Sequence, residues 1–430
     1  MDYQTSLDYL FGLQLFGVKL GLENMQTLKV RLPRLREPLP CVHVAGTNGK
    51  GSVSVMLAEM LKHSGLRVGL YTSPHLHCFT ERIRVDGVPI SRSEAASLAE
   101  TVRAAAGATP VTFFEATTAM ALLAFKEHQV DIAVFETGLG GRLDATNIVE
   151  PQLCLITPVS LDHCEYLGSR LAQIASEKAG IIKAGIPVVV GKQDPEAVAV
   201  ILAVAADLGA EVQLAGRDFS WQGDHENLTF LSGQDQLHGL SCELGGVHQL
   251  DNLAQAVAGA MQLRKQGVAI TDQAIRTACE SVSWPGRLEW QGNPRRVLLD
   301  VSHNLAGITC LADYLAAQEV SGIHLVVGMS GQRNPVEALM PLVKFTAAVY
   351  AVPVSCGQTV PPAKIVAWAV AQGVAVQEYA SAVEGFSAAL ANAGSRAAVV
   401  VCGSLYLVAE LRHEFKEGGA AVAQCAADHP

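Results

Sequence analysis

The chain has 430 residues, of which half are hydrophobic and 17% are charged. This length exceeds what one hydrophobic core supports, so we expect two domains, or three. The composition excludes a disordered chain and favours α/β domains with buried parallel sheets. The formal net charge of −10 argues against non-specific binding to nucleic acid or to anionic membranes, so an anionic ligand needs a local basic site.

The cysteines predict a cytoplasmic protein, and the N-terminus shows no targeting segment. Ten cysteines are scattered without a C-x-x-C pair, which is typical of reduced core residues in a cytosolic protein. Residues 1–4 do not begin a basic region followed by an apolar stretch, and no uncharged span reaches membrane length. We therefore expect neither a signal peptide nor a transmembrane helix.

Strand and helix patterns alternate along the first half of the chain, which predicts a mostly parallel, doubly wound sheet. Expected strands cover residues 41–45, 67–71, 83–85, 132–136, 153–157 and 187–190, and expected helices follow residue 50, begin at residue 91 and cover about 114–128.

The second half predicts a change of domain. Residues 216–246 are typical of a less regular β segment, and residues 248–265 of a helix. A stretch rich in proline, glycine and arginine, residues 284–296, looks like a domain boundary. We expect an N-terminal domain at 1–284, a linker at 285–296 and a C-terminal α/β domain at 297–430, with strands at 297–300, 324–328, 347–351 and 398–402. The tail after Phe415 is expected to fray.

A glycine-rich loop follows the first expected strand, with the sequence Gly46-Thr47-Asn48-Gly49-Lys50-Gly51-Ser52. Small residues let backbone N–H groups surround an anion, Lys50 adds a positive charge, and the next helix directs its positive end to the same place. The spacing departs from the common P-loop, because Val44 holds the first glycine position and Ser52 comes one residue late. The alternative is an ordinary glycine-rich turn, but the apolar face of the following helix favours a triphosphate site.

A second cluster, residues 136–147, begins with Glu136 at the carboxyl end of an expected strand and reads ETGLGGRLDATN. Open α/β sheets place ligands at this edge. A carboxylate beside a phosphate loop is a usual Mg²⁺ ligand, although a solvated glutamate in a glycine-rich loop is the alternative. Two further segments, residues 160–163 (SLDH) and 176–181 (SEKAGI), add a histidine and a lysine, which gain weight only from these neighbours.

Together these segments resemble bacterial folylpolyglutamate synthase/dihydrofolate synthase, a family of the Mur-type ATP-dependent ligases. The motifs occur in order over nearly the whole chain: GTNGKGS, TSPHL (72–76), ERI (81–83), FE (114–115), ETGLGGRLDATN, SLDH, EYLG (165–168), IASEKAGI (174–181), HQLDN (248–252), PGR (285–287), DVSHN (300–304) and CGSLYL (402–407). The loop GTNGKGS is this family's version, which accounts for its departure from the common pattern.

The resemblance implies an N-terminal P-loop ATPase domain of the Mur-ligase type, with a mostly parallel sheet, and a C-terminal Rossmann-like α/β domain. It also implies a reaction of folate biosynthesis and one-carbon metabolism. ATP phosphorylates a carboxylate of a pterin-containing substrate, and the amine of L-glutamate displaces the phosphate to leave an amide, ADP and phosphate. Positioning and metal electrostatics should dominate this chemistry. We expect small-molecule substrates, a monomer, and no nucleic-acid or membrane partner.

The family's roles transfer to matching positions of the N-terminal domain. The loop from Thr47 to Ser52, with Gly49, Gly51, the backbone from Asn48 onward and Lys50, would hold the β- and γ-phosphates. Ser73 with Glu136 would bind one Mg²⁺, and His163 a second.

Lys178 would be carbamylated and oriented towards the second metal, since a lysine reacts with CO₂ only as the neutral amine, and burial near cations lowers its pKa. The alternative is a surface lysine on an amphipathic helix. Asp144 would bind the pterin or, as the alternative, would hydrogen-bond its own loop.

In the second half, Asn252 and Arg287 would contact the nucleotide, Asp300 would meet ribose or adenine, and His303 would approach the triphosphate. Asn304 is an N-cap as readily as a ligand. His75 and His77 lie close together in the sequence, as zinc ligands can. Because the cysteines nearby are unpaired, we propose no zinc site.

The chain departs from many relatives at residues 329–334, where MSGQRN replaces an acidic motif; Arg333 would still reach ligand or the opposing domain. Two rivals remain: another Mur-type ligase, and a non-catalytic nucleotide-binding protein. Against the first, the phosphate loop begins some 45 residues in, which leaves no room for a UDP-binding domain in front.

Overall fold

The computed structural model describes residues 1–16, 20–292, 296–355, 357–394 and 397–415. The chain forms two compact units. The N-terminal unit contains Met1–His75, Phe79–Glu243 and Gln249–Val282, and the C-terminal unit contains Leu76–Cys78, Leu244–His248 and the chain from Ser283 onward. The expected fraying after Phe415 lies outside the described residues.

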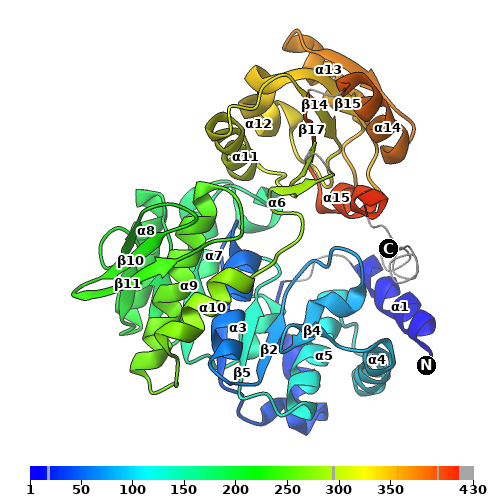
Figure 1. The fold of residues 1–430 in the computed structure, drawn as a ribbon. Coiled ribbons are helices and arrows are strands. Elements are labelled where there is room, and N and C mark those ends of the chain that lie inside the picture. The colour runs from blue at the N-terminus through cyan, green and yellow to red at the C-terminus, as the bar shows by residue number, and fades with distance from the viewer. Residues whose placement is uncertain (17–19, 293–295, 356, 395–396, 416–430) are drawn as a thin grey trace. The chain divides into compact units, whose positions relative to one another are not determined.

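An eight-stranded sheet forms the centre of the N-terminal unit (Figure 1). Its strands in spatial order are β4 (Val88–Pro89), β3 (Ile83–Val85), β2 (Val68–Tyr71), β5 (Ile132–Glu136), β1 (Cys41–Ala45), β6 (Leu153–Ile156), β7 (Val188–Val190) and β8 (Val212–Leu214). The six strands from β2 to β8 in this order are parallel, and β3 and β4 are antiparallel to their neighbours. The expected doubly wound architecture is therefore confirmed.

Helices cover both faces of this sheet. The helices of the unit are α1 (Tyr3–Gly12), α2 (Glu23–Arg31), α3 (Lys50–His63), α4 (Arg92–Ala106), α5 (Phe113–Glu127), α6 (Cys164–Leu167), α7 (Leu171–Ala179), α8 (Pro195–Asp207), α9 (Val247–Lys265) and α10 (Asp272–Ser281). One core joins α1, α2, α4 and α5 to Ala133 and Phe135 of β5. On the other face Gly259 of α9 lies against Leu155 of β6 and Leu57 of α3. Parallel strands buried on both faces read as continuous apolar runs, which is why they were predictable.

Capping residues set the starts of the helices. Ser91 caps α4, and Thr112 and Glu115 form a capping box at α5. Short 3-10 helices connect several elements: η1 (Leu13–Phe16), η2 (Pro33–Arg36), η3 (Phe79–Arg82) and η4 (Ala145–Ile148) in this unit, and η5 (Met340–Phe345) and η6 (His413–Phe415) in the other.

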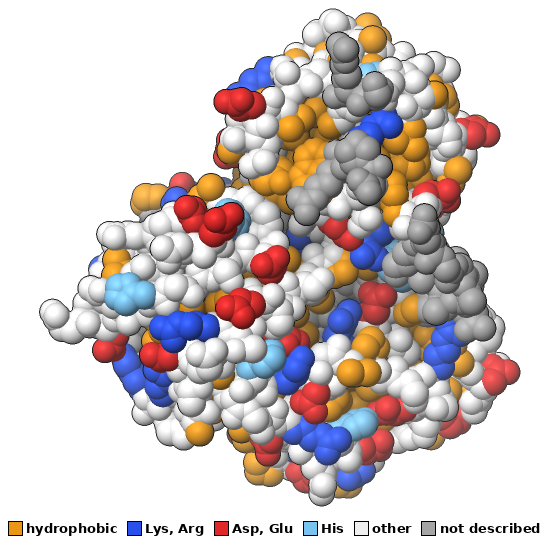
Figure 2. Space-filling view, viewed as in Figure 1, with side chains coloured by type: hydrophobic (Ala, Val, Ile, Leu, Met, Phe, Trp, Pro, Cys, Tyr) orange, Lys and Arg blue, Asp and Glu red, His pale blue; other side chains and the backbone are white. Residues whose placement is uncertain are grey.

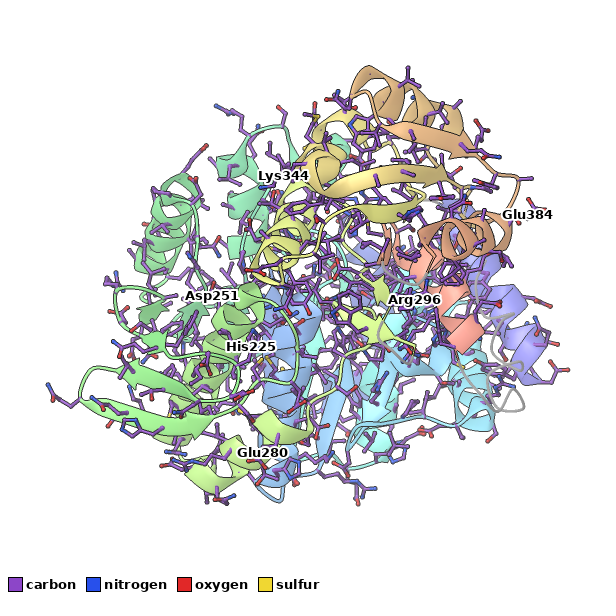
Figure 3. All side chains as sticks on the ribbon, turned by 45° about the horizontal axis from the view of Figure 1, so that its top comes forward. His225, Asp251, Glu280, Arg296, Lys344 and Glu384 are labelled. Carbon is purple, nitrogen blue, oxygen red and sulfur yellow. The ribbon has the colours of Figure 1, made fainter. Side chains whose placement is uncertain are left out.

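The irregular segment 216–246 folds as a separate antiparallel sheet of β9 (Ser220–Gln222), β10 (Leu228–Ser232) and β11 (Asp235–Leu240), in the order β11-β10-β9. Leu228, Phe230 and Leu237 are buried, so one face of this sheet is packed. Trp221 Nε1 donates a 2.8 Å hydrogen bond to Asp251 Oδ1 of α9, which ties the small sheet to that helix (Asp251 is labelled in Figure 3).

The C-terminal unit is a six-stranded sheet with the order β12 (Glu289–Gln291), β13 (Val297–Leu299), β17 (Val399–Cys402), β14 (Ile323–Val327), β15 (Thr346–Ala351) and β16 (Ala375–Glu378). All neighbours are parallel except β12 with β13. Its helices are α11 (Leu305–Ala317), α12 (Pro335–Leu339), α13 (Pro362–Ala371), α14 (Ala382–Ala393) and α15 (Leu405–Arg412).

The structure corrects two details of the expected organisation. The segment 285–296 is not simply a linker, because β12 lies within it and pairs with β13. The C-terminal unit also includes the distant segment Leu76–Cys78, because Leu76 packs in that unit's core with Val301 and Val408. Of the eight described cysteines, seven are free thiols, and five of these are buried as expected for reduced core residues. The expectation is wrong at Cys78, which is disulfide-bonded.

Candidate functional site

The phosphate loop joins the end of β1 to the start of α3, as its sequence predicts. Gly46 and Gly49 have φ angles of 149° and 85°, which are unfavourable for residues with a side chain. A Cβ on Gly46 would lie 1.8 Å from Thr157 Oγ1, and a Cβ on Gly49 would lie 2.5 Å from Asn252 Oδ1. Both glycines are therefore required by conformation and by close approach.

Some backbone N–H groups of the phosphate loop donate to other parts of the protein, and others lie in the uncapped first turn of α3. The N–H groups of Thr47 and Asn48 donate to the carbonyl of Pro158, at 2.9 and 3.3 Å. Helix α3 begins at Lys50 behind Gly49, without a side-chain cap, and the first-turn N–H groups of a helix have no intrahelical acceptor. The backbone N–H groups left without an intrahelical acceptor are those of the first turn, Lys50, Gly51 and Ser52, and this turn begins two residues after Asn48, where the sequence placed the first donor.

A pair of hydrogen bonds fixes the phosphate loop to the segment after β6. Thr47 Oγ1 donates to the carbonyl of Ser160 at 3.0 Å and accepts from the N–H of Ser160 at 3.1 Å. Asn48 Nδ2 donates to Ser160 Oγ at 3.3 Å. His163 lies three residues after Ser160. The hydrogen bonds to Ser160 therefore fix the start of the loop that carries His163.

Lys178 is buried beneath the phosphate loop, on α7. Its side chain is 4% exposed and its Nζ donates a 2.6 Å hydrogen bond to the carbonyl of Gly46. Burial, followed by the nearby charge of Lys50, lowers the pKa of Lys178 to about 7. The alternative of a solvated surface lysine is wrong, and a large fraction of Lys178 is a neutral amine near neutral pH.

Glu136 and Ser73 follow neighbouring strands at the same sheet edge. Glu136 is 4% exposed at the end of β5, and its Oε2 accepts a 3.1 Å hydrogen bond from the N–H of Ser73. The alternative of a solvated glutamate is therefore wrong.

The oxygen atoms near the loop fit a magnesium ion. Ser52 Oγ is buried and has no hydrogen-bond partner within the described residues, and Glu136 supplies a carboxylate. No group of three or more histidine, cysteine, aspartate or glutamate residues suited to a metal occurs in the described part of the chain. Mg²⁺ commonly uses one or two protein carboxylates together with substrate phosphates, so this donor set suits Mg²⁺ bound with a nucleotide.

His163 lies on the exposed loop before α6. Its backbone is left-handed, with φ of 50°, and its side chain is 43% exposed, with Nδ1 4.0 Å from Glu165 Oε1. Non-glycine residues seldom adopt this conformation, which concentrates at functional sites. His75, by contrast, is buried and its Nδ1 accepts a 2.7 Å hydrogen bond from Arg82 Nε.

Asp144 organises its own loop. Its Oδ2 accepts from the N–H groups of Gly138 and Leu139, at 2.9 and 2.8 Å, and its Oδ1 accepts from the N–H and hydroxyl of Thr146. Burial raises its pKa, against the lowering effect of these hydrogen bonds. The geometry gives direct support to the loop-organising alternative.

Asn252 lies on α9 against the phosphate loop. It is 4% exposed, and its Nδ2 donates to Gln249 Oε1 at 2.9 Å. Its Oδ1 is the atom that the missing side chain of Gly49 would meet. Asn252 therefore borders the phosphate loop.

In the C-terminal unit, the candidates lie at the carboxyl end of β13. Asp300 is 6% exposed and bridges two backbone N–H groups at 3.0 Å, of Leu288 and Ser302. His303 Nδ1 lies 3.0 Å from the carbonyl of Val301. Asn304 caps α11 by accepting from the N–H of Gly307 at 2.9 Å, which confirms its N-cap alternative.

Arg287 is held on a constrained turn. Gly286 before it has φ of 74° and donates its N–H to Glu289 Oε2 at 2.8 Å. Arg412 of α15 in turn donates to both oxygens of Glu289, at 2.8 to 3.0 Å.

Arg333 lies in the segment 329–334, where the sequence departs from the family pattern. Its Nη1 donates to the carbonyl of Ser330 at 2.7 Å.

Sequence reasoning missed several residues that support the loop. Thr157, Pro158 and Gln193 belong to this group; Gln193 Nε2 donates to the Thr157 carbonyl and its Oε1 accepts from Val159 N–H, both at 2.8 Å. Their positions after β6 and β7, at the edge where parallel strands place ligands, were the available indication.

Comparison with known proteins defines the class. Residues 44–260 match the Mur ligase middle domain, and residues 286–405 match the Mur ligase glutamate ligase domain. The chain therefore has the domain composition and the fold of a Mur-type ligase, with the phosphate loop, Glu136 and Lys178 in its N-terminal unit.

Individual relatives narrow the class. The dihydrofolate synthase/folylpolyglutamate synthase of Escherichia coli (strain K12) is 35% identical over 408 residues, covering 94% of this chain and 93% of the relative. The chain belongs to the folylpolyglutamate synthase/dihydrofolate synthase family of Mur ligases.

Solved structures agree with this assignment. E. coli FolC in complex with DHPP and ADP superimposes with a TM-score of 0.87 at 33% identity, covering 96% of this chain and 97% of that one. The bifunctional synthase of Yersinia pestis CO92, complexed with AMPPNP and a manganese ion, gives 0.86 at 32% identity, covering 96% and 97%.

The surface and the helices add two observations. None of the helices in the described residues has the length and apolar character needed to cross a membrane. On the face drawn in Figure 2, acidic and basic side chains are intermixed.

Proposed function

We propose that this chain is an ATP-dependent ligase that adds L-glutamate, through an amide bond, to dihydropteroate, to reduced folate polyglutamates, or to both. The observation that carries this function is the convergence of the phosphate loop, buried Glu136 and buried Lys178 at one sheet edge, in a chain whose relatives are named for these two activities.

The phosphate loop binds and orients ATP. Lys50 and the free amides of the first turn of α3 hold the β- and γ-phosphates, with Asn252 bordering the loop. No protein nucleophile is needed, because ATP phosphorylates the acceptor carboxylate and the glutamate amine then displaces phosphate from the acyl phosphate. The protein contributes alignment and charge stabilisation.

A divalent metal accompanies ATP, and we assign Mg²⁺ to two positions. Ser73 and Glu136 are the proposed ligands of the first ion, and His163 of the second. When bound, Mg²⁺ neutralises phosphate charge and helps to align the phosphates. Glu136 is held ready for this role by the hydrogen bond from Ser73 N–H.

Lys178 is the proposed carbamylated residue. Carbamylation requires an unprotonated amine, and burial together with the charge of Lys50 favours that form. The product is an anionic group, which suits a position between the phosphate loop and the loop of His163. Its present hydrogen bond to Gly46 would be available from the carbamate N–H.

Roles on the acceptor side and in the C-terminal unit are part of the same proposal. Asp144 borders the pterin site chiefly by holding the Gly138–Leu139 turn, because its oxygens already accept four hydrogen bonds. Arg287, Asp300 and His303 are proposed nucleotide contacts. We also propose that the enzyme acts as a monomer and that it works in the cytoplasm; the five buried free thiols support that compartment, whereas the disulfide at Cys78 does not.

The test is a ligation assay. Purified protein is incubated with ATP, Mg²⁺ and L-glutamate, with either dihydropteroate or a reduced folate, and the product is identified by mass. A mass gain of one glutamyl residue with either acceptor supports the proposal. Absence of an amide with both acceptors overturns the substrate assignment.

The same assay separates the alternatives. Another amino-acid ligase of the Mur type would release ADP only with a different acceptor, and a non-catalytic nucleotide-binding protein would release none. ADP release that does not depend on glutamate would indicate simple ATP hydrolysis.

A further inference from the structure

His43 lies in the middle of β1, three residues before the phosphate loop, and its side chain is 0% exposed. Its four neighbours in the strand are apolar and buried. Leaving a buried polar group unpaired costs about 1–3 kcal/mol, and an aliphatic residue would avoid this cost. His43 Nδ1 has no hydrogen-bond partner within the described residues. A reason for a histidine at this position must therefore come from the other ring nitrogen, Nε2.

That nitrogen begins a chain of hydrogen bonds. His43 Nε2 lies 2.8 Å from Thr146 Oγ1, and Thr146 Oγ1 lies 2.5 Å from Asp144 Oδ1. Asp144 Oδ2 accepts from the N–H groups of Gly138 and Leu139. The chain therefore runs from the strand that carries the phosphate loop to the turn that follows Glu136.

The direction of each bond follows from proton counting. Burial raises the pKa of Asp144, but three backbone N–H groups donate to its two oxygens and stabilise the carboxylate, so the Thr146 hydroxyl donates its single proton to Asp144. Thr146 Oγ1 must then accept from His43, and the ring carries its proton on Nε2. Nδ1 is left as an unprotonated acceptor, which agrees with its lack of a donor.

We propose that His43 is a positioning residue. Through Thr146 and Asp144 its Nε2–H fixes the Gly138–Leu139 turn and, with it, the orientation of the Glu136 carboxylate for Mg²⁺. This inference rests on the proposed function because the metal role of Glu136 does.

Paired variants at both ends of the chain test the role. His43→Gln keeps a side-chain N–H donor, whereas His43→Leu removes it; Thr146→Ser keeps the hydroxyl, whereas Thr146→Val removes it. The half-saturating Mg²⁺ concentration should rise about 10-fold or more in His43→Leu and Thr146→Val. It should stay within about 3-fold of the unchanged protein in His43→Gln and Thr146→Ser, and KM for glutamate should stay unchanged throughout.

The double variant His43→Leu/Thr146→Val should be no worse than either single variant, because both remove one chain. Equal Mg²⁺ dependence in all variants overturns the proposal, and so does a loss in His43→Gln equal to that in His43→Leu. If His43→Leu does not fold, as judged by circular dichroism, the comparison of Thr146→Val with Thr146→Ser decides.

Two readouts need no ligase activity. Ring ¹⁵N NMR of the unchanged protein, with the signal assigned by its loss in His43→Gln, should show Nε2 protonated and Nδ1 unprotonated. The opposite tautomer, or a charged ring at neutral pH, overturns the proposal. The Mg²⁺ dependence of ADP binding by calorimetry should weaken in the same two variants. If the unchanged protein makes no amide but shows these results, the proposed function fails while the positioning role stands.

Discussion

Lys178 and Gly46 are joined by a 2.6 Å hydrogen bond from the lysine Nζ to the glycine carbonyl, although they lie 132 residues apart in the chain. This bond places an almost fully buried amine directly beneath the phosphate loop. The position of the lysine therefore depends on the conformation of the phosphate loop. Burial and the charge of Lys50 lower the pKa of the lysine.

Replacing Lys178 with alanine should abolish turnover, with a loss of at least about 100-fold in kcat, because the anionic group that carbamylation supplies acts on developing charge. ADP binding without metal should change much less. Steady-state ADP release and calorimetry measure the two effects. Lys192→Ala, at an exposed lysine, is the matched control and should keep full activity.

A small carboxylate such as acetate should restore part of the activity of Lys178→Ala, since truncation leaves room for an anion where the carbamate would be. It should not stimulate the unchanged protein. Undiminished activity of Lys178→Ala would show that the carbamate is not needed.

The lowered pKa of Lys178 also predicts how stability depends on pH. An unfolded lysine keeps its proton up to about pH 10.5, whereas folded Lys178 loses it above about pH 7. Between these values the unfolded state binds more protons, so the free energy of unfolding rises with pH, by at most about 1.4 kcal/mol per pH unit for one proton.

Lys178→Met removes this contribution. In CO₂-free buffer, urea unfolding at pH 7, 8 and 9 should show the unchanged protein gaining stability relative to Lys178→Met as pH rises. Parallel curves for the two proteins would contradict the assigned pKa.

Much of the site was predictable because it is local. The phosphate loop, Glu136 and the Asn304 cap depend on residues a few positions apart, so strand patterns and capping rules found them. Two features were not predictable. The capture of the Thr47 and Asn48 amides by Pro158 joins segments over 100 residues apart. The short strand β12 was hidden in a stretch rich in glycine and proline because three residues carry too little pattern.

Burial of charged groups was likewise beyond the sequence. Lys178 lies on an amphipathic helix, and the same pattern fits a solvated lysine; only the packing of α7 under β1 separates the two. For His43 the burial was predictable, because it lies within an apolar strand. Its hydrogen-bond partner Thr146 was not predictable, because it lies 103 residues away in the chain.

Glu136→Gln should weaken the response to Mg²⁺ while leaving metal-free ADP binding intact. The amide oxygen can still accept from Ser73 N–H, so this hydrogen bond is kept while the negative charge is lost. We expect the half-saturating Mg²⁺ concentration to rise about 10- to 100-fold. Titration of activity with Mg²⁺ measures this, with Glu150→Gln at an exposed glutamate as the control; an equal response in both variants would remove Glu136 from the metal site.

Gly49 and Gly65 form a natural pair for testing the phosphate loop, because their φ angles are 85° and 86° and their surroundings differ. A Cβ on Gly65 meets nothing within 4 Å, whereas a Cβ on Gly49 would lie 2.5 Å from Asn252 Oδ1. Alanine at either position carries the same left-handed backbone strain, about 1–2 kcal/mol.

Gly65→Ala should therefore lose about that much stability and keep its affinity for ADP. Gly49→Ala should lose more stability, and its ADP affinity should fall at least about 10-fold, because relieving the clash moves either Asn252 or the start of α3, where the phosphate donors lie. Thermal unfolding and calorimetry on both variants measure the two effects. Equal ADP affinity in the two variants would mean that the loop tolerates displacement at Gly49, and that the free amides of α3 do not hold the phosphates.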